Sequence, residues 1–376
     1  MQNDYLEFYE KHKVSPVKQD IQNLEAHTNR RLGLLRQLGI HYFCIKGKKI
    51  LEVGPGGGFN SLAINNLHPK SLTLVEPNTT GYKELLSNLK DYRNIYSYNM
   101  TLEEFSSNVK EKYDVVFCEG LIQGLTSKEI FINILKEKVS ETGILVITVA
   151  DEISIFFEIV RKLLSNIFLK DIKDFEKKIE LMKKIFKKDL DSLIYMTRKQ
   201  EDWCIDLMCD AYYNHTFSIS DALKLLEKDF FLLGSSPNIM TDFRWYKSLS
   251  NNYEEYNNYF YQNFNKIKHS FLDYRTNISE RSTIDNDELS SLCKEFIKIV
   301  KTIEKNKIDF KDTNIVEILK KIKDNVLNID KLIDDSIDEL INLLEKPIIT
   351  IKDIEELKYL PLSFGKGQIF LSFSKK

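Results

Sequence analysis

The sequence lacks the features that mark secreted, membrane-spanning or zinc-binding proteins. Its cysteines form no CxxC pair and no four-ligand zinc set, and their odd number argues against a disulfide framework. No run of about 18 apolar residues occurs, and the first residues, MQNDYLEFYEKHK, contain no apolar signal-peptide stretch. We therefore expect a soluble, cytoplasmic protein with no metal site. The five cysteines are Cys44, Cys118, Cys204, Cys209 and Cys293.

An excess of charge of either sign is also absent. The chain has 54 lysine and arginine residues against 56 aspartate and glutamate residues, which gives a formal net charge of −2. No global basic field therefore draws it towards nucleic acid. Its 376 residues, 43% of them hydrophobic, can bury one large core or two modest ones, so composition does not fix the number of domains.

Short apolar segments alternate with helical stretches between residues 49 and 149. Because strands separated by helices form βαβ units, this alternation predicts a parallel sheet. DFFLLGSSP at 229–237 and GQIFLSFS near the C-terminus also have strand character, and the helix before 229 has Ser218 or Ser220 as its expected cap. The strands expected in the alternating region are KILEVG, SLTLVEP, IYSYN, YDVVFCEG and GILVITVA.

The remaining segments have the periodicity of helices. Apolar residues three or four apart predict helices over 16–38, which Gly39 ends, and at 153–164 and 172–186. From 289 to 344 the apolar spacing is close to 3.5 residues, which predicts a coiled-coil-like hairpin of two helices that turns near 306–313.

The segment ILEVGPGGGFNS carries the strongest chemical signal. An apolar strand ends at Glu52, turns through Gly54, Gly56 and Gly58, and enters a helix. Glycine tolerates positive φ and lets a ligand approach the backbone closely, and the helix N-terminus offers free amides. A dinucleotide-binding GxGxxG pattern would require glycine at position 59, where this chain has phenylalanine.

The ExGxGxG pattern instead resembles motif I of class I S-adenosyl-L-methionine-dependent methyltransferases. The resemblance is specific over residues 49–150. It implies an α/β fold with a seven-stranded sheet, parallel with an antiparallel last strand, and large helical insertions. The expected divisions are an N-terminal helical segment (1–44), a cofactor-binding core (45–150), a helical insertion or lid (151–217), a return to the core (218–240), a second helical insertion (241–361) and a final strand (362–376).

The resemblance also implies site residues. Glu76, followed by Pro77 at the end of the second strand, would accept hydrogen bonds from the ribose hydroxyls, although it would suit NAD equally well. Cys118 and Glu119 end the fourth strand, beside the methionine part of the cofactor and the substrate, so Glu119 is a candidate catalytic residue. Thr101 and Leu102 stand where the family usually has an acidic residue flanking the adenine.

The substrate-binding residues are less well defined by the sequence. His27 and Arg31 lie four apart on the N-terminal helix, and Arg244, Trp245 and Tyr246 would clamp an anionic or sugar-like substrate. A solvated helix face and core packing are the simpler explanations. His215 is the histidine we favour as a general base, against an ordinary capping or surface role.

We expect methyl transfer to a small-molecule or saccharide-like acceptor, with the helical insertions forming a lid and a homodimer surface. Methylation of RNA or protein is the alternative among methyltransferases, and near-neutral charge argues against RNA. A non-catalytic cofactor-binding scaffold is the alternative from another class, and a redox enzyme is a more distant one.

Overall fold

The computed structural model describes residues 4–15, 18–209, 216–239, 241–242 and 244–376. The chain divides into two compact units. The sheet unit comprises residues 1–150, 209–263 and 368–376, and the helical unit comprises residues 151–208 and 264–367. None of the described helices is long and apolar enough to cross a membrane. All five cysteines are free thiols.

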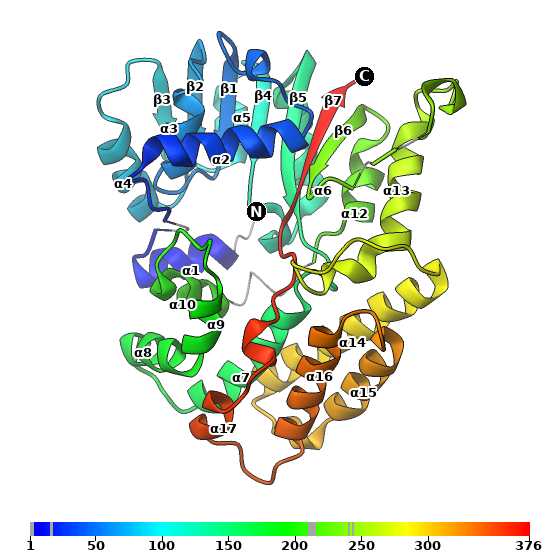
Figure 1. Ribbon diagram of the computed structural model, residues 1–376. Helices are drawn as coiled ribbons and strands as arrows, with labels where there is room; N and C mark the ends of the chain where they lie inside the picture. Colours follow the sequence, from blue (N-terminus) through cyan, green and yellow to red (C-terminus); the bar gives the residue numbers. More distant parts are fainter. Residues whose placement is uncertain (1–3, 16–17, 210–215, 240, 243) are drawn as a thin grey trace. The chain divides into compact units, whose positions relative to one another are not determined.

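The sheet unit is built on seven strands in the order β3-β2-β1-β4-β5-β7-β6 (Figure 1). The first five strands pair in parallel, and β7 is antiparallel to both β5 and β6. This confirms the predicted class I methyltransferase sheet with an antiparallel last strand. The strands are β1 Lys49–Val53, β2 Ser71–Val75, β3 Ile95–Tyr98, β4 Tyr113–Cys118, β5 Val139–Val149, β6 Phe230–Ser236 and β7 Ile369–Lys375.

The central strands are buried because helices cover the sheet. β1, β2 and β4 are almost continuously buried, as their near-continuous apolar sequences predict for parallel strands. The helices of this unit are α1 Asp4–His12, α2 Leu24–Gln37, α3 Phe59–Asn65, α4 Thr79–Leu89, α5 Leu102–Asn108, α6 Lys128–Lys138, α12 Ile219–Leu226 and the first part of α13 Glu255–Ile267.

Helix α2 lies across one face of the sheet (Figure 1), and Leu38 at its C-terminal end contacts β6 and β7. A Cβ atom at Gly234 in β6 would lie 2.8 Å from the carbonyl carbon of Leu38, so glycine permits this close approach. The Ser372 hydroxyl in β7 donates to the Leu38 carbonyl at 2.5 Å. The sequence predicted a helix from residue 16, but α2 begins at Leu24, where Asn23 caps it. Gly39, which has φ +69°, ends the helix as predicted.

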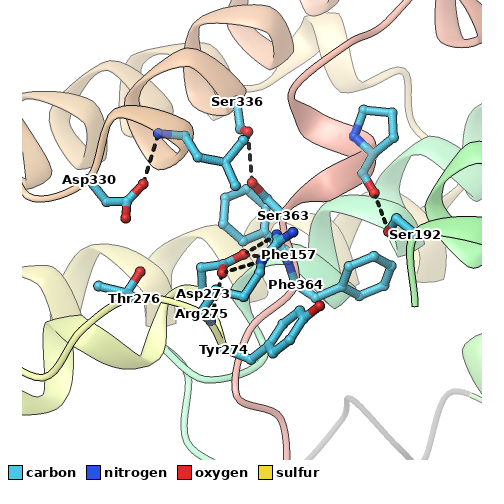
Figure 2. Close-up of polar contacts among 12 residues, drawn as sticks. Phe157, Ser192, Asp273, Tyr274, Arg275, Thr276, Asp330, Ser336, Ser363 and Phe364 are labelled. Atoms are coloured by element: carbon cyan, nitrogen blue, oxygen red, sulfur yellow. Dashed lines mark hydrogen bonds and ion pairs between the residues drawn. The ribbon is translucent and has the colours of Figure 1, made fainter. Parts of the chain in front are cut away.

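The helical unit has a polar cluster around Asp273, which Figure 2 shows. The carboxylate of Asp273 accepts hydrogen bonds from the Arg275 side chain and from the backbone of Phe364. Arg161 lies 3.7 Å from the Phe364 ring and pairs with Asp189 at 2.8 Å. The helices of this unit are α7 Phe156–Leu169, α8 Phe175–Ile185, α9 Lys187–Ser192, α10 Gln200–Met208, α14 Thr283–Asn306, α15 Ile315–Val326, α16 Lys331–Leu344 and α17 Ile351–Glu355.

The predicted two-helix hairpin in this unit is wrong in its second half. Helix α14 ends at Asn306 near the predicted turn, but the segment expected as one helix to Leu344 is two helices, α15 and α16. Asn328 has φ +66° between them, and Asp330 caps α16. The apolar period continued through this break because both helices bury the same kind of stripe, so spacing alone did not reveal it.

Candidate functional site

The glycine turn after β1 adopts the conformation that its sequence predicts. Gly54, Gly56 and Gly58 have φ values of +73°, +56° and +78°. Residues that have a side chain rarely adopt such φ values, so the turn requires glycine at each position. Gly58 is also the N-cap of α3, and a helix N-terminus has free amides for an anionic or polar ligand group.

Glu76 fastens this turn to the end of β2. One of its oxygens accepts a hydrogen bond from the Gly56 amide at 2.7 Å, and the other accepts one from the Asn78 amide at 2.8 Å. The side chain is buried, and burial raises the pKa of Glu76 to about 7 although both backbone bonds act in the opposite direction. A carboxylate has about four acceptor sites, so lone pairs remain for hydroxyl donors of a ligand.

Glu52 is a second buried carboxyl group at the turn. It accepts a hydrogen bond from the Ser61 hydroxyl at 2.6 Å, which joins the end of β1 to helix α3. Burial raises the pKa of Glu52 to about 7, while the bond from Ser61 opposes the rise. The nearby charges of Glu119 and Glu76 add to it. The turn therefore concentrates acidic groups where a cationic ligand group would favour their ionised forms.

A cavity of about 160 Å³ lies in the sheet unit at the carboxyl ends of β1 and β2. Ligands of open α/β sheets bind at this edge. Val53, Val75, Pro77, Thr101 and Leu102 line it, so the structure brings three predicted cofactor residues together around one apolar space. The lining also includes Leu6, Glu7, Glu103, Leu121, Leu125 and Phe131, which the sequence analysis did not identify.

Helix α1 is the main contribution that the sequence analysis missed. It supplies Leu6 and Glu7 to the cavity, and the carboxylate of Glu10 accepts hydrogen bonds from the Thr79 amide and the Asn78 side chain. Tyr5 lies so close to Gly124 that any larger residue there would clash with its ring. Tyr5 and Tyr9 are buried and lie four positions apart, so they share one face of the helix. This spacing could have predicted the helix from the sequence.

Arg31 and Glu119 form a bidentate ion pair between α2 and the end of β4. The distances from the Arg31 nitrogens to the two Glu119 oxygens are 2.9 and 2.6 Å, and both side chains are largely buried. The Nε atom of Arg31 is buried and has no hydrogen-bond partner in the described part of the chain. The structure therefore brings together a predicted substrate-binding residue and a predicted catalytic residue.

His27 is buried one turn before Arg31 on the same helix. Burial, and then the charges of Arg30 and Arg31, lower the pKa of His27, so the imidazole is neutral near pH 7. Within the described residues its Nε2 atom has no hydrogen-bond partner. The two residues face the protein interior, which excludes the simpler explanation of a solvated helix face.

Two of the predicted cofactor residues have structural roles that the sequence did not reveal. The Thr101 hydroxyl and the Glu104 carboxylate cap each other's backbone amides at the start of α5, which is a complete capping box. Cys118 is fully buried, and burial raises its pKa well above the usual range, so its thiol stays protonated. The contact of each residue with the cofactor remains a prediction.

Three other predicted residues, Arg244, Trp245 and Tyr246, belong to the segment after β6. Arg244 donates to Asp242, and its guanidinium lies 4.4 Å from the Tyr259 ring, so its contacts are local to the segment after β6. Trp245 and Tyr246 are 65% and 68% exposed, so core packing does not explain them. His215 lies outside the described residues.

We predict that the unfolding free energy falls between about pH 5 and about pH 8 in part because of Glu52 and Glu76. The pKa of each carboxyl group is about 7 in the folded protein, against the ordinary glutamate value of 4.5 that applies in the unfolded chain. The folded state therefore holds protons that the unfolded state releases; this stability is complete below 4.5 and is lost as pH rises through 7. Urea titrations should show that Glu52→Gln reduces the pH dependence.

Glu111→Gln is the matched control, because Glu111 is exposed and lies on the surface of the same unit. Its pH dependence should match that of the unchanged protein. An equal pH dependence in the Glu52→Gln variant would contradict the assignment.

Comparisons with known proteins match limited parts of the chain. No protein-family model and no curated protein sequence matches it. Among solved structures, the N-methyltransferase NodS from Bradyrhizobium japonicum WM9, bound to S-adenosyl-L-homocysteine, matches with 20% identity and a TM-score of 0.32, over 40% of this chain and 75% of that chain. An S-adenosylmethionine-dependent methyltransferase from Mesorhizobium loti matches with 11% identity and a TM-score of 0.26, over 30% and 50%.

Proposed function

We propose that the protein transfers a methyl group from S-adenosyl-L-methionine to a small-molecule or saccharide-like acceptor. One observation carries the proposal. The turn of left-handed glycines is fastened to Glu76 beside an apolar cavity, at the carboxyl ends of β1 and β2 of a seven-stranded sheet. An adenosyl group needs this combination of an apolar space for a base and a carboxylate for ribose hydroxyls.

Two features favour this cofactor over a dinucleotide. Phe59 occupies the position where a GxGxxG turn needs its third glycine for close packing of helix and strand. Strand β7 lies between β5 and β6 and antiparallel to both, as the methyltransferase resemblance implies. A dinucleotide fold would instead continue the parallel order.

The residues of the turn would have separate roles. Glu76 would accept hydrogen bonds from the ribose, and Pro77, Leu102 and Leu121 would enclose the adenine. Burial disfavours the ionised form of Glu52, and the positive charge of a bound ligand group would stabilise that form. Glu52 would therefore attract a cationic group. The cofactor supplies an electrophilic methyl group on a sulfonium, so the protein has chiefly to align the acceptor and exclude water.

The Arg31–Glu119 pair would form the polar end of the site. Two hydrogen bonds hold the carboxylate of Glu119 against Arg31, and its remaining lone pairs can accept hydrogen bonds from a ligand. We therefore propose that Glu119 orients the acceptor or the methionine part of the cofactor. Acceptors that need no base, such as neutral amines, suit such a site.

Calorimetric titration with S-adenosyl-L-homocysteine tests the cofactor proposal. We expect saturable binding by the unchanged protein and none of NAD. Binding of NAD alone would favour a redox enzyme. Binding of neither would favour a scaffold that acts by association without a cofactor, and would contradict the proposal. Incubating the protein with labelled S-adenosyl-L-methionine and a metabolite extract should then transfer label to a small molecule whose mass rises by about 14 daltons, because a methyl group replaces a hydrogen.

Salt-dependent transfer of label to RNA, or transfer to protein, would contradict the small-molecule acceptor while leaving the cofactor proposal intact.

A further inference from the structure

A larger cavity lies entirely within the helical unit. Its volume is about 290 Å³, close to the lower end of the range of about 300–1,000 Å³ typical of small-molecule sites. It lies where the C-terminal ends of α7, α10 and α14 meet the start of α8 and the turn at Phe310–Asp312. Neither the glycine turn nor any predicted site residue that the structure describes contributes to it.

Much of the cavity wall is aliphatic. Leu163 and Leu169 of α7 and Ile303 of α14 are buried residues that contribute to it, together with Met208. Buried apolar surface of this kind favours an aliphatic group, because each methylene that leaves water adds to the binding free energy. The wall therefore suits a hydrocarbon chain.

Lysines dominate the charged groups around this apolar wall. Among the residues that the structure describes, four lysines line the cavity together with two acidic residues, Glu304 and Asp309. The Asp309 carboxylate is already engaged, because it caps the turn that follows by accepting the Lys311 amide. The four lysines are Lys162, Lys170, Lys178 and Lys307.

One lysine is internal and the others are available. Lys162 is buried, and its ammonium pairs with Glu304 at 3.0 Å and donates to the Met208 carbonyl at 3.5 Å. Within the described ranges, the other three lysines form no ion pair. Lys178 lies near the start of α8, where the helix dipole favours acidic residues, so the dipole does not explain its presence.

Asn166 adds a buried donor to the same wall. Its side-chain nitrogen Nδ2 is inaccessible to solvent and has no hydrogen-bond partner among the residues that the structure describes. A buried amide donor without a partner loses its hydrogen bonds to water and gains none in return, and such groups are rare in folded proteins. An oxygen of a ligand in the cavity would satisfy it after a small rotation of the Asn166 side chain, which lines the cavity.

We propose that this cavity is a second ligand site, which binds a small amphipathic anion with an aliphatic tail. The tail lies against Leu169, Ile303 and Ile308, and the anionic head accepts hydrogen bonds from lysine ammonium groups and from Asn166. A charged acceptor oxygen forms stronger hydrogen bonds to ammonium groups than a neutral one does. The site is independent of the cofactor site, so the proposal does not rest on methyl transfer.

Calorimetric titration of the full chain with octanoate tests the proposal. We expect saturable binding of octanoate, binding of octanol at least about tenfold weaker, and no binding of octylammonium, because only octanoate combines the tail with a negative charge. Lys178→Glu should weaken octanoate binding by about tenfold or more through the reversed charge. Asn166→Leu should weaken octanoate binding while leaving octanol binding unchanged or stronger.

Lys177→Glu is the matched control. This neighbour is exposed on the same helix, does not line the cavity and gives the same change in net charge. Its octanoate affinity should stay within about twofold of the unchanged protein, since exposed charges outside the cavity are screened. Absence of octanoate binding, octanol binding as tight as octanoate binding, or equal effects of Lys177→Glu and Lys178→Glu would overturn the proposal.

Discussion

Replacing Gly54 by valine should weaken the binding of S-adenosyl-L-homocysteine by at least about a hundredfold, which corresponds to about 2.7 kcal/mol. Gly54 has φ +73°, and a β-branched residue in this region costs about 1–3 kcal/mol. A Cβ atom there would already lie 3.4 Å from the Leu121 side chain, which lines the cavity. The additional methyl groups of valine would occupy space that the ligand needs. Calorimetric titration measures the loss.

Gly47→Val separates backbone strain from loss of the site. Gly47 has nearly the same backbone angle, φ +71°, but a Cβ atom at this position would have nothing within 4 Å. We expect this variant to lose comparable stability and to retain normal cofactor binding. Equal affinities of the two variants would show that Gly54 is not part of the binding site, and would remove the observation on which the proposed function rests.

Replacing Arg31 by methionine should destabilise the sheet unit by about 3–5 kcal/mol, because it leaves the largely buried Glu119 without its partner. The nearby charge of Glu52 adds to the cost, since its electrostatic interaction with Glu119 is unfavourable. Cys118 is buried next to Glu119 in the chain, so its thiol reports opening of this unit. Pulse labelling of Cys118 across a urea titration, read from the peptide that contains it, measures the urea concentration at which the thiol becomes reactive. This midpoint should lie at lower urea concentration in Arg31→Met than in the unchanged protein.

Two further variants test the cause of this loss. Lys49→Met breaks the exposed ion pair between Lys49 and Glu111, whose side chains are 41% and 44% exposed, and should cost much less stability than Arg31→Met because solvent screens the pair. Adding Glu119→Gln to Arg31→Met removes the uncompensated charge and should restore part of the stability. If Arg31→Met were no more harmful than Lys49→Met, the pair would contribute little to the site.

The sequence was most informative where local chemistry has a single structural solution. Three alternating glycines after an apolar strand predicted a left-handed turn, and all three have positive φ. The near-continuous apolar strands predicted a buried parallel sheet, because only a sheet covered on both faces needs them. Ser218 was one of two expected caps, and it caps α12 with a complete capping box.

It was less informative where a contact joins residues far apart in the chain. Arg31 and Glu119 are 88 positions apart, and neither position has a local pattern that pairs it with the other. Helix α1 contributes to the cavity through Leu6 and Glu7, but a short amphipathic segment does not reveal which surface it covers. The unbroken apolar stripe of α15 and α16 hid the break between them for a similar reason.

The sequence by itself thus determined the glycine turn, the strand at which it lies and the class of sheet, because backbone sterics and apolar periodicity act over a few neighbouring residues. Only the tertiary structure decided that Glu76 fastens the turn, that Arg31 neutralises Glu119, and that lysines from separate helices surround one cavity. Burial and charge pairing depend on which distant segments pack together, and that choice belongs to the whole fold.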